Sequence, residues 1–221
     1  MLRNEKGTAH TREGHATIRA GERKTERFEE FFHSSEPDRD KFLSRLFGIF
    51  NEEVVRHWCE CSQAPYEDLG SPTLRLPGER RWHTLDFTFR SRETGKVYVA
   101  ELKCEIEFMG YRYMRLQTGD ELRHHSGEAF RKLLLAAKDP KAVEVSVVGK
   151  PLAVDGAVLV WGAVTSGGRK AVMREYGFAD VLSLEAILGN LRAWAPPAWL
   201  ERIERLRRYS NELFGYLLGS G

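Results

Sequence analysis

Apolar residues recur at three- and four-residue steps over residues 38–61, which is the spacing of one face of a helix. The residues of this face are Leu43, Leu46, Phe47, Phe50, Val54 and Trp58. Pro37 suits the first turn of this helix, and the aspartate that follows it suits a cap. Glu53 and His57 fall on the apolar face, whereas Glu52 falls off it. The pattern therefore predicts a helix whose inward face carries a carboxylate.

Two segments further along alternate apolar and polar residues with a period of two. Residues 82–90 read WHTLDFTFR, and residues 96–108 read KVYVAELKCEIEF. In the second segment Glu101 and Lys103 share one face, opposite Ala100 and Leu102. The short turn at residues 92–95 contains a glycine, so the two segments are expected to form an antiparallel hairpin.

The remaining pattern alternates helices and strands. Helices are expected over residues 120–138, 169–176, 184–194 and 197–218, and strands over 143–147, 157–164 and 180–184, with a short strand also possible at 72–76. The run AVLVWGAV at 157–164 is apolar throughout, as in a strand buried on both faces. The order predicts an α/β domain with a mixed central sheet over residues 25–195. Residues 1–24 are expected to be a flexible polar tail, and residues 196–221 a C-terminal helix.

Composition narrows the class of protein. Of the 221 residues, 42% are hydrophobic and 30% are charged, which is typical of a globular chain. No stretch approaches the ~20 apolar residues of a membrane span, and the first residues lack the apolar core of a secretory signal. Three cysteines without a spaced framework favour the reducing cytoplasm. A net charge of +2 neither requires nor excludes a nucleic-acid partner.

The predicted hairpin carries three candidate catalytic or metal-binding residues, namely Asp86, Glu101 and Lys103. The hairpin register brings the two carboxylates together, where each raises the pKa of the other. A hard divalent cation such as Mg²⁺ would relieve the repulsion. Lys103 would then stand beside the metal, placed to orient or deprotonate a water or to stabilise a phosphate. The competing interpretation is an ion network on a solvated face of the sheet.

An acid-x-Lys triplet alone is weak evidence, because about one is expected by chance in a chain of this composition. The sequence holds three, at residues 22–24, 101–103 and 139–141. Only the triplet at 101–103 lies in an apolar strand that follows another strand with an isolated aspartate. This context sets Glu101 and Lys103 apart.

Asp86, fourteen residues and then Glu101-Leu102-Lys103 resemble the core motif of the PD-(D/E)xK nucleases. Residues 157–188 are similar to the late strand, helix and short strand of Mrr- and RecB-like nuclease domains, and the resemblance covers about residues 38–194. It implies a restriction-endonuclease-like core, a central mixed β-sheet flanked by helices. It also makes Asp86 and Glu101 the metal ligands, Lys103 the catalytic lysine and Glu53 the acidic residue of the helix. Mg²⁺ is the implied cofactor, with Mn²⁺ as a substitute.

The chain departs from the family pattern at two points. Leu85 stands where the family has proline, a residue that is not a ligand. No tyrosine follows Gln117 at the spacing of the RecB-type Gln-x-x-x-Tyr element, which argues against an exonuclease of that subgroup.

A basic and aromatic segment follows the motif. Tyr111, Arg112, Tyr113 and Arg115 alternate within YRYMRLQ, and such residues neutralise phosphates and stack on bases. An ordinary loop is the alternative interpretation. The apolar stripe of the last helix either caps the core or forms the seam of a homodimer, as in many members of the family.

Other candidate sites have weaker support. His57, Cys59 and Cys61 lack the second half of a zinc site. His124-His125 is more typical of a solvated helix start than of a catalytic pair; a position near the site is the alternative. Neither a phosphate-binding loop nor a nucleophile elbow is present.

The residues together with the resemblance predict a Mg²⁺-dependent endonuclease that hydrolyses DNA, and the resemblance implies a 5′-phosphate product. The alternative is a catalytically inactive module on the same fold that binds nucleic acid or supports an assembly. RNA is a third, weaker expectation as the substrate.

Overall fold

The computed structural model describes residues 27–219, so the predicted tail at residues 1–24 lies outside them. The helices are α1 (Phe28–Phe32), α2 (Pro37–Glu60), α3 (Glu128–Lys138), α4 (Ser166–Tyr176), α5 (Leu184–Trp194) and α6 (Pro197–Leu217), with 3₁₀ turns η1 (Asp120–Leu122) and η2 (Pro140–Ala142). The strands are β1 (Tyr66–Asp68), β2 (Pro72–Arg75), β3 (His83–Thr84), β4 (Phe87–Ser91), β5 (Val97–Lys103), β6 (Arg115–Leu116), β7 (Glu144–Val147), β8 (Lys150–Pro151), β9 (Gly156–Trp161), β10 (Ala163–Val164) and β11 (Asp180–Ser183).

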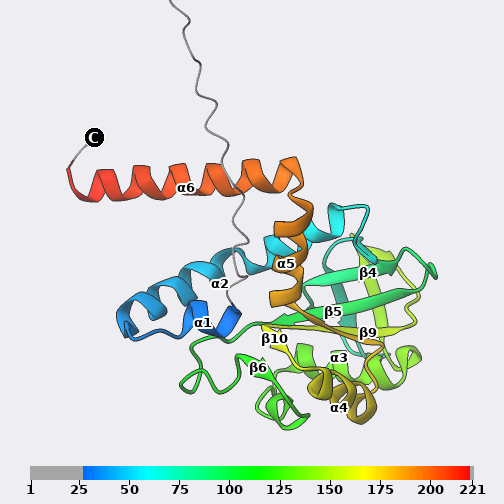
Figure 1. Ribbon diagram of the computed structural model, residues 1–221. Helices are drawn as coiled ribbons and strands as arrows, with labels where there is room; N and C mark the ends of the chain where they lie inside the picture. Colours follow the sequence, from blue (N-terminus) through cyan, green and yellow to red (C-terminus); the bar gives the residue numbers. More distant parts are fainter. Residues whose placement is uncertain (1–26, 220–221) are drawn as a thin grey trace, which may run out of the picture.

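The central sheet has the strand order β1-β4-β5-β9-β11 (Figure 1). Strands β1, β4 and β5 pair antiparallel, and β5, β9 and β11 pair parallel, so the sheet is mixed. Helices cover both of its faces, which confirms the α/β class with a mixed sheet flanked by helices. Every residue of β9 is buried, as its apolar run predicts for a strand between two others and two helical layers.

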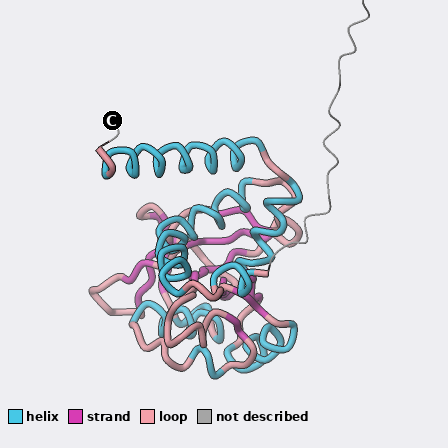
Figure 2. The backbone as a smooth tube through the Cα atoms, turned by 60° about the vertical axis from the view of Figure 1, so that its left-hand side comes forward, coloured by secondary structure: helices cyan, strands magenta, loops and turns pink. Residues whose placement is uncertain are grey.

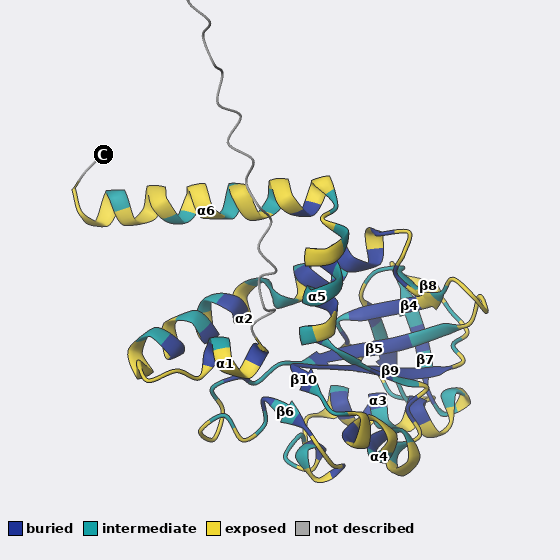
Figure 3. Cartoon of the chain, in the orientation of Figure 1, coloured by how far each residue is buried: buried dark blue, intermediate teal, exposed yellow. Residues whose placement is uncertain are grey.

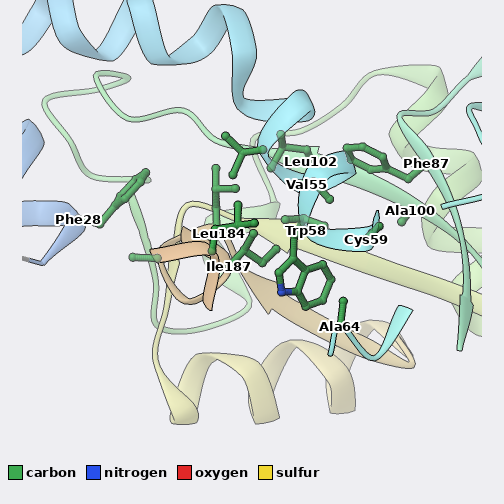
Figure 4. Close-up of a cluster of buried hydrophobic side chains, with 14 of the residues drawn as sticks. Phe28, Val55, Trp58, Cys59, Ala64, Phe87, Ala100, Leu102, Leu184 and Ile187 are labelled. Carbon is green, nitrogen blue, oxygen red and sulfur yellow. The ribbon is translucent and has the colours of Figure 1, made fainter. Parts of the chain in front are cut away.

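Each face of the sheet carries its own apolar cluster. Helices α2 and α5 pack on the face that presents Phe87, Ala100 and Leu102, and Trp58 lies at the centre of that cluster (Figure 4). Helices α3 and α4 cover the opposite face, where Val99 packs (Figure 3). Because Glu101 follows Val99 with the strand period of two, it also points toward the α3 side and is 7% exposed. The face that carries Glu101 is therefore covered and not solvated.

The expected single strand over residues 82–90 is wrong. The chain bends at Asp86, and β3 leaves the hairpin to join a second sheet of order β3-β2-β7-β8. Strand β5 also ends at Lys103, five residues before its expected end, where its pairing with β9 stops. The helix expected over 120–138 is divided into η1 and α3. Asp86, Lys103 and the chain that follows Lys103 consequently lie at one end of the hairpin.

Helix α6 extends along the outer side of the molecule above α2 (Figures 1 and 2), and the ring of Phe214 lies 6.4 Å from that of Phe42 in α2. Its first turn is anchored by Trp199, which is 9% exposed, and its far end presents exposed Leu213, Phe214 and Leu217. Among the described residues, no helix combines the length and apolar character needed to cross a membrane.

Candidate metal and acid–base centre

Asp86 lies at the bend between β3 and β4, and backbone and side-chain contacts fix it there. Its Oδ2 accepts a hydrogen bond of 2.7 Å from the backbone amide of Leu102. Its carbonyl oxygen accepts from Arg56 at 3.2 Å and from Ser71 at 3.0 Å. Phe87 pairs with Ala100, so Asp86 stands beside Glu101 on the neighbouring strand. The predicted meeting of these two residues on adjoining chain segments is present.

The side chains of Glu101 and Lys103 point to the same face of β5, as their spacing predicts. Lys103 Nζ donates to Glu101 Oε1 at 2.8 Å, and the two side chains are 23% and 10% exposed. The other oxygen, Glu101 Oε2, is buried, and no described group gives it a hydrogen bond. A buried carboxylate oxygen without a hydrogen bond lowers the stability of the folded protein, and a bound cation would give this atom a partner.

The pKa of Asp86 is raised to about 7. Burial is the largest cause, and the neighbouring charge of Glu101 is the second. The Leu102 amide and the Lys103 ammonium act in the opposite direction, since both favour the charged carboxylate, while Glu52 adds to the increase. Neighbouring groups of like charge that are shielded from water are typical of sites that transfer protons or bind metal ions.

The residues present fit a hard divalent cation. Asp86 and Glu101 offer carboxylate oxygens, which are the donors that Mg²⁺ and Mn²⁺ take in proteins. Glu101 Oε2 is the atom that lacks a partner. Such an ion, when bound, would polarise a phosphoryl oxygen and make a bound water more acidic.

The expected position of Glu53 facing the sheet is wrong. Arg202 of α6 donates to both carboxylate oxygens of Glu53, at 2.8 and 2.9 Å. His57, one turn on, packs against Trp199 of α6 with ring centroids 5.9 Å apart and lies 3.0 Å from Glu60. The side of α2 that carries Glu53 and His57 therefore contacts α6, and the Glu53 side chain, 43% exposed, lies at the edge of the molecule and not against the sheet.

Glu52 is the acidic residue of α2 whose charge reaches Asp86. It pairs with Arg56 one turn on, at 3.3 Å. Arg56 also binds Asp68 at 2.7 Å and lies over the Phe87 ring, 4.8 Å from its centroid. The sequence analysis overlooked Arg56, and the i,i+4 spacing of an acid and an arginine beside the apolar stripe was the available signal.

A second group of polar side chains lies just past Lys103. Glu105, His124 and His125 place one possible ligand atom each within 4.8 Å of the others, and the group could hold a metal ion. His124 Nε2 lies 2.7 Å from Glu105 Oε2, and His125 Nδ1 lies 3.8 Å from Glu105 Oε1. The expectation of a solvated helix start at the two histidines is wrong, because their side chains are 19% and 8% exposed.

Burial lowers the pKa of His125 to about 4, against the opposing effect of the Glu105 charge. The charges of His124 and Lys103 lower this pKa as well. His125 is thus a neutral imidazole at pH 7. The Phe130 ring centroid lies 5.9 Å from Lys103 Nζ and 5.0 Å from the ring of His125, so the histidine group is near the Asp86–Glu101–Lys103 centre.

Most residues of the segment expected to bind nucleic acid make contacts within the protein. Tyr111 stacks on His33 with centroids 4.2 Å apart, and Arg115 pairs with Glu29 at 2.6 Å. Tyr113 packs on the ring of His124, 3.9 Å between centroids. Arg112 is exposed and lies over the Tyr113 ring. Of the four residues, Arg112 is the one whose charge faces solvent without a described carboxylate.

Cys59 and Cys61 are buried thiols. Burial raises the pKa of both, which disfavours the thiolate that zinc requires. The weak expectation of metal binding at this triplet gains no support.

No protein-family model matches the chain, and neither a curated protein nor a solved structure matches it significantly. The function is therefore inferred from the side chains of the chain itself.

Proposed function

We propose that the protein is a metal-dependent nuclease that hydrolyses phosphodiester bonds in DNA, acting as an endonuclease on a restriction-endonuclease-like fold. The observation that carries the proposal is Glu101 Oε2, a buried carboxylate oxygen without a hydrogen bond, next to a second desolvated carboxylate and a lysine. Burial and the charge of Glu101 disfavour the charged form of the half-buried Asp86 carboxylate and so weaken the folded state, and Mg²⁺ or Mn²⁺ would offset that cost. An ion network kept only for stability would not leave this oxygen unpaired.

Each side chain has a role that follows from its contacts. Asp86 and Glu101 would hold the ion, and the Leu102 amide orients Asp86 from behind. Lys103 is held by Glu101 Oε1 and can donate a hydrogen bond to the attacking water or to the phosphoryl oxygens as their charge develops. In the reaction the water oxygen bonds to phosphorus and the bond to the 3′ oxygen of the sugar breaks. The water gives up one proton and the leaving oxygen gains one, which leaves a 5′-phosphate and a 3′-hydroxyl.

The position in the sheet also supports a ligand site. Lys103 ends β5, which runs parallel to β9 and β11, and ligands of α/β sheets bind beyond the carboxyl ends of such strands. A groove of about 470 Å³ opens beside the chain that follows, lined in part by Glu105 and the exposed Phe108 and Met109. Arg112 on the same loop supplies an exposed positive charge for a phosphate.

The proposal includes a second copy of the chain, since cleavage of both strands of a duplex requires two centres. Along α6 the residues 199, 203, 206, 210, 213 and 217 recur at alternating steps of four and three, the spacing of a coiled-coil seam. Apart from Ser210 these residues are apolar. Trp199 is covered by the body, whereas Leu213 and Leu217 are 55% and 66% exposed. The exposed half of the seam is suited to α6 of another copy.

The test is incubation of the full chain with supercoiled plasmid, linear duplex, single-stranded DNA and RNA, in Mg²⁺, Mn²⁺ or EDTA. We expect nicked and linear plasmid in either metal and intact plasmid in EDTA. Cleavage of RNA alone would replace the substrate class. Intact substrates in all conditions, with a melting temperature indifferent to millimolar Mg²⁺ and Mn²⁺, would favour an inactive module that binds nucleic acid or supports an assembly.

A further inference from the structure

The side chains of Glu105, His124 and His125 form a compact group between β5 and α3. Glu105 follows β5 by two residues, and the histidines lie between η1 and α3. The two carboxylate oxygens divide between the two imidazoles: Oε2 lies 2.7 Å from His124 Nε2, and Oε1 lies 3.8 Å from His125 Nδ1. Three donors from two separate segments thus converge on one small volume.

His125 has no hydrogen bond that explains its burial. Its side chain is 8% exposed, its Nε2 is buried without a partner among the described groups, and its Nδ1 is too far from Glu105 for a hydrogen bond. Two atoms bonded to one zinc ion at ~2.0–2.2 Å lie roughly 3–4 Å apart in a tetrahedral site. The 3.8 Å between His125 Nδ1 and Glu105 Oε1 falls within this range and is too long for a hydrogen bond.

Aromatic rings enclose the group. Tyr113 lies on His124, and the rings of Phe130 and Trp161 lie 5.0 and 5.6 Å from that of His125. The two imidazole centroids are 3.8 Å apart. Such walls limit water and strengthen the attraction between a cation and the Glu105 carboxylate. Glu105 itself, 35% exposed at the edge of the groove, leaves a route of entry.

We propose that Glu105, His124 and His125 bind a divalent transition ion of the zinc class at a site separate from Asp86 and Glu101. Two imidazoles and one carboxylate are the donor set that Zn²⁺ takes with an open fourth position, whereas Mg²⁺ prefers oxygen alone. Because the ligands come from the chain after β5 and the chain before α3, the bound ion also joins these segments beside Lys103. The site does not depend on the proposed nuclease activity.

The test is binding of Zn²⁺ to the metal-stripped full chain, measured by calorimetry, with Co²⁺ absorption as a probe of nitrogen coordination. We expect one Zn²⁺ per chain that millimolar Mg²⁺ does not displace. His124→Gln and His125→Gln should each weaken Zn²⁺ binding more than about 100-fold, since loss of an outer-shell partner alone costs 10–100-fold. His57→Gln is the matched control, because His57 also lies beside a glutamate and an aromatic ring. The affinity of the His57→Gln variant for Zn²⁺ should equal that of the wild type.

Two further variants keep the outcome decisive. Glu105→Gln changes the most exposed of the three ligands and should lose Zn²⁺ affinity while it remains folded. Asp86→Asn should retain that affinity, which separates this site from the carboxylate pair. A wild-type chain that binds no Zn²⁺ at micromolar concentration would overturn the proposal. Equal binding by wild type and Glu105→Gln, or loss of binding in Asp86→Asn alone, would do the same.

Discussion

Replacing Asp86 by asparagine should stabilise the metal-free protein above neutral pH. Asparagine keeps the shape and an oxygen that can accept from the Leu102 amide, but it removes the carboxylate that burial and Glu101 disfavour. The pKa of Asp86 rises from 3.8 to about 7 on folding. At 1.36 kcal/mol per pH unit this corresponds to a penalty on the order of 4 kcal/mol for the charged form, and solvent at the half-buried carboxylate reduces it to about 2–4 kcal/mol.

The sign of the pH dependence follows from proton linkage. Between pH 4 and 7 the folded state holds the Asp86 proton and the unfolded state has lost it, so this group's contribution to the free energy of unfolding falls as pH rises. Below pH 4 both states are protonated, and wild type and Asp86→Asn should be equally stable. Their difference should grow between pH 4 and pH 7 and then stay constant.

The assay is urea unfolding in EDTA at intervals from pH 3.5 to 8.5, followed by circular dichroism, for wild type and Asp86→Asn. Asp120→Asn is a matched control, because that aspartate is 68% exposed and its replacement should change stability by at most about 0.5 kcal/mol. A difference between wild type and Asp86→Asn that does not vary with pH, or a variant less stable than wild type at pH 8, would refute the reasoning. Added Mg²⁺ should stabilise the wild type and leave Asp86→Asn unchanged.

Four further predictions concern the centre, helix α2 and helix α6. Lys103→Ala should lower the cleavage rate by about 10²–10³-fold with nearly unchanged DNA affinity, as measured by plasmid nicking and fluorescence anisotropy, because its hydrogen bonds strengthen in the transition state. Glu52→Gln should lower the pKa of Asp86, followed by carboxyl NMR titration, because it removes a nearby negative charge. Glu53→Gln should leave that pKa unchanged and cost about 0.5–1 kcal/mol of stability through its lost ion pair. Leu213→Glu should convert a dimer to a monomer in light scattering without changing the melting temperature of the body.

A control variant or a contrary outcome tests each of these predictions. Lys170→Ala removes an exposed lysine of α4 and should leave cleavage intact. Equal nicking rates for Lys103→Ala and wild type would show that the lysine has no part in the chemistry. If Glu53→Gln moves the pKa of Asp86 more than Glu52→Gln does, α2 is rotated relative to the structure. A wild type that is monomeric at all concentrations would remove the second copy from the proposal.

The local sequence determines most of the elements. The three- and four-residue steps predict 38–61 as a helix, and α2 spans Pro37–Glu60. The apolar run at 157–164 predicts one strand buried on both faces; β9 is buried throughout, but it ends at Trp161, and residues 163–164 form β10 of a separate sheet. The period of two places Glu101 and Lys103 on one face, where the structure also places them. Periodicity succeeds here because it records which side of an element leaves water.

Tertiary structure alone decided which neighbour each buried side chain meets. Glu53 lies on the predicted inward stripe of α2, yet its side chain is 43% exposed and pairs with Arg202 of α6 instead of facing the sheet. The period of two continues through Asp86, but β3 is drawn into a second sheet and the strand breaks at that residue. His124 and His125 have the polarity of a surface turn, and rings from distant segments bury them beside Glu105. A pattern along the chain reports burial, whereas the identity of a partner depends on contacts between segments that only the folded chain brings together.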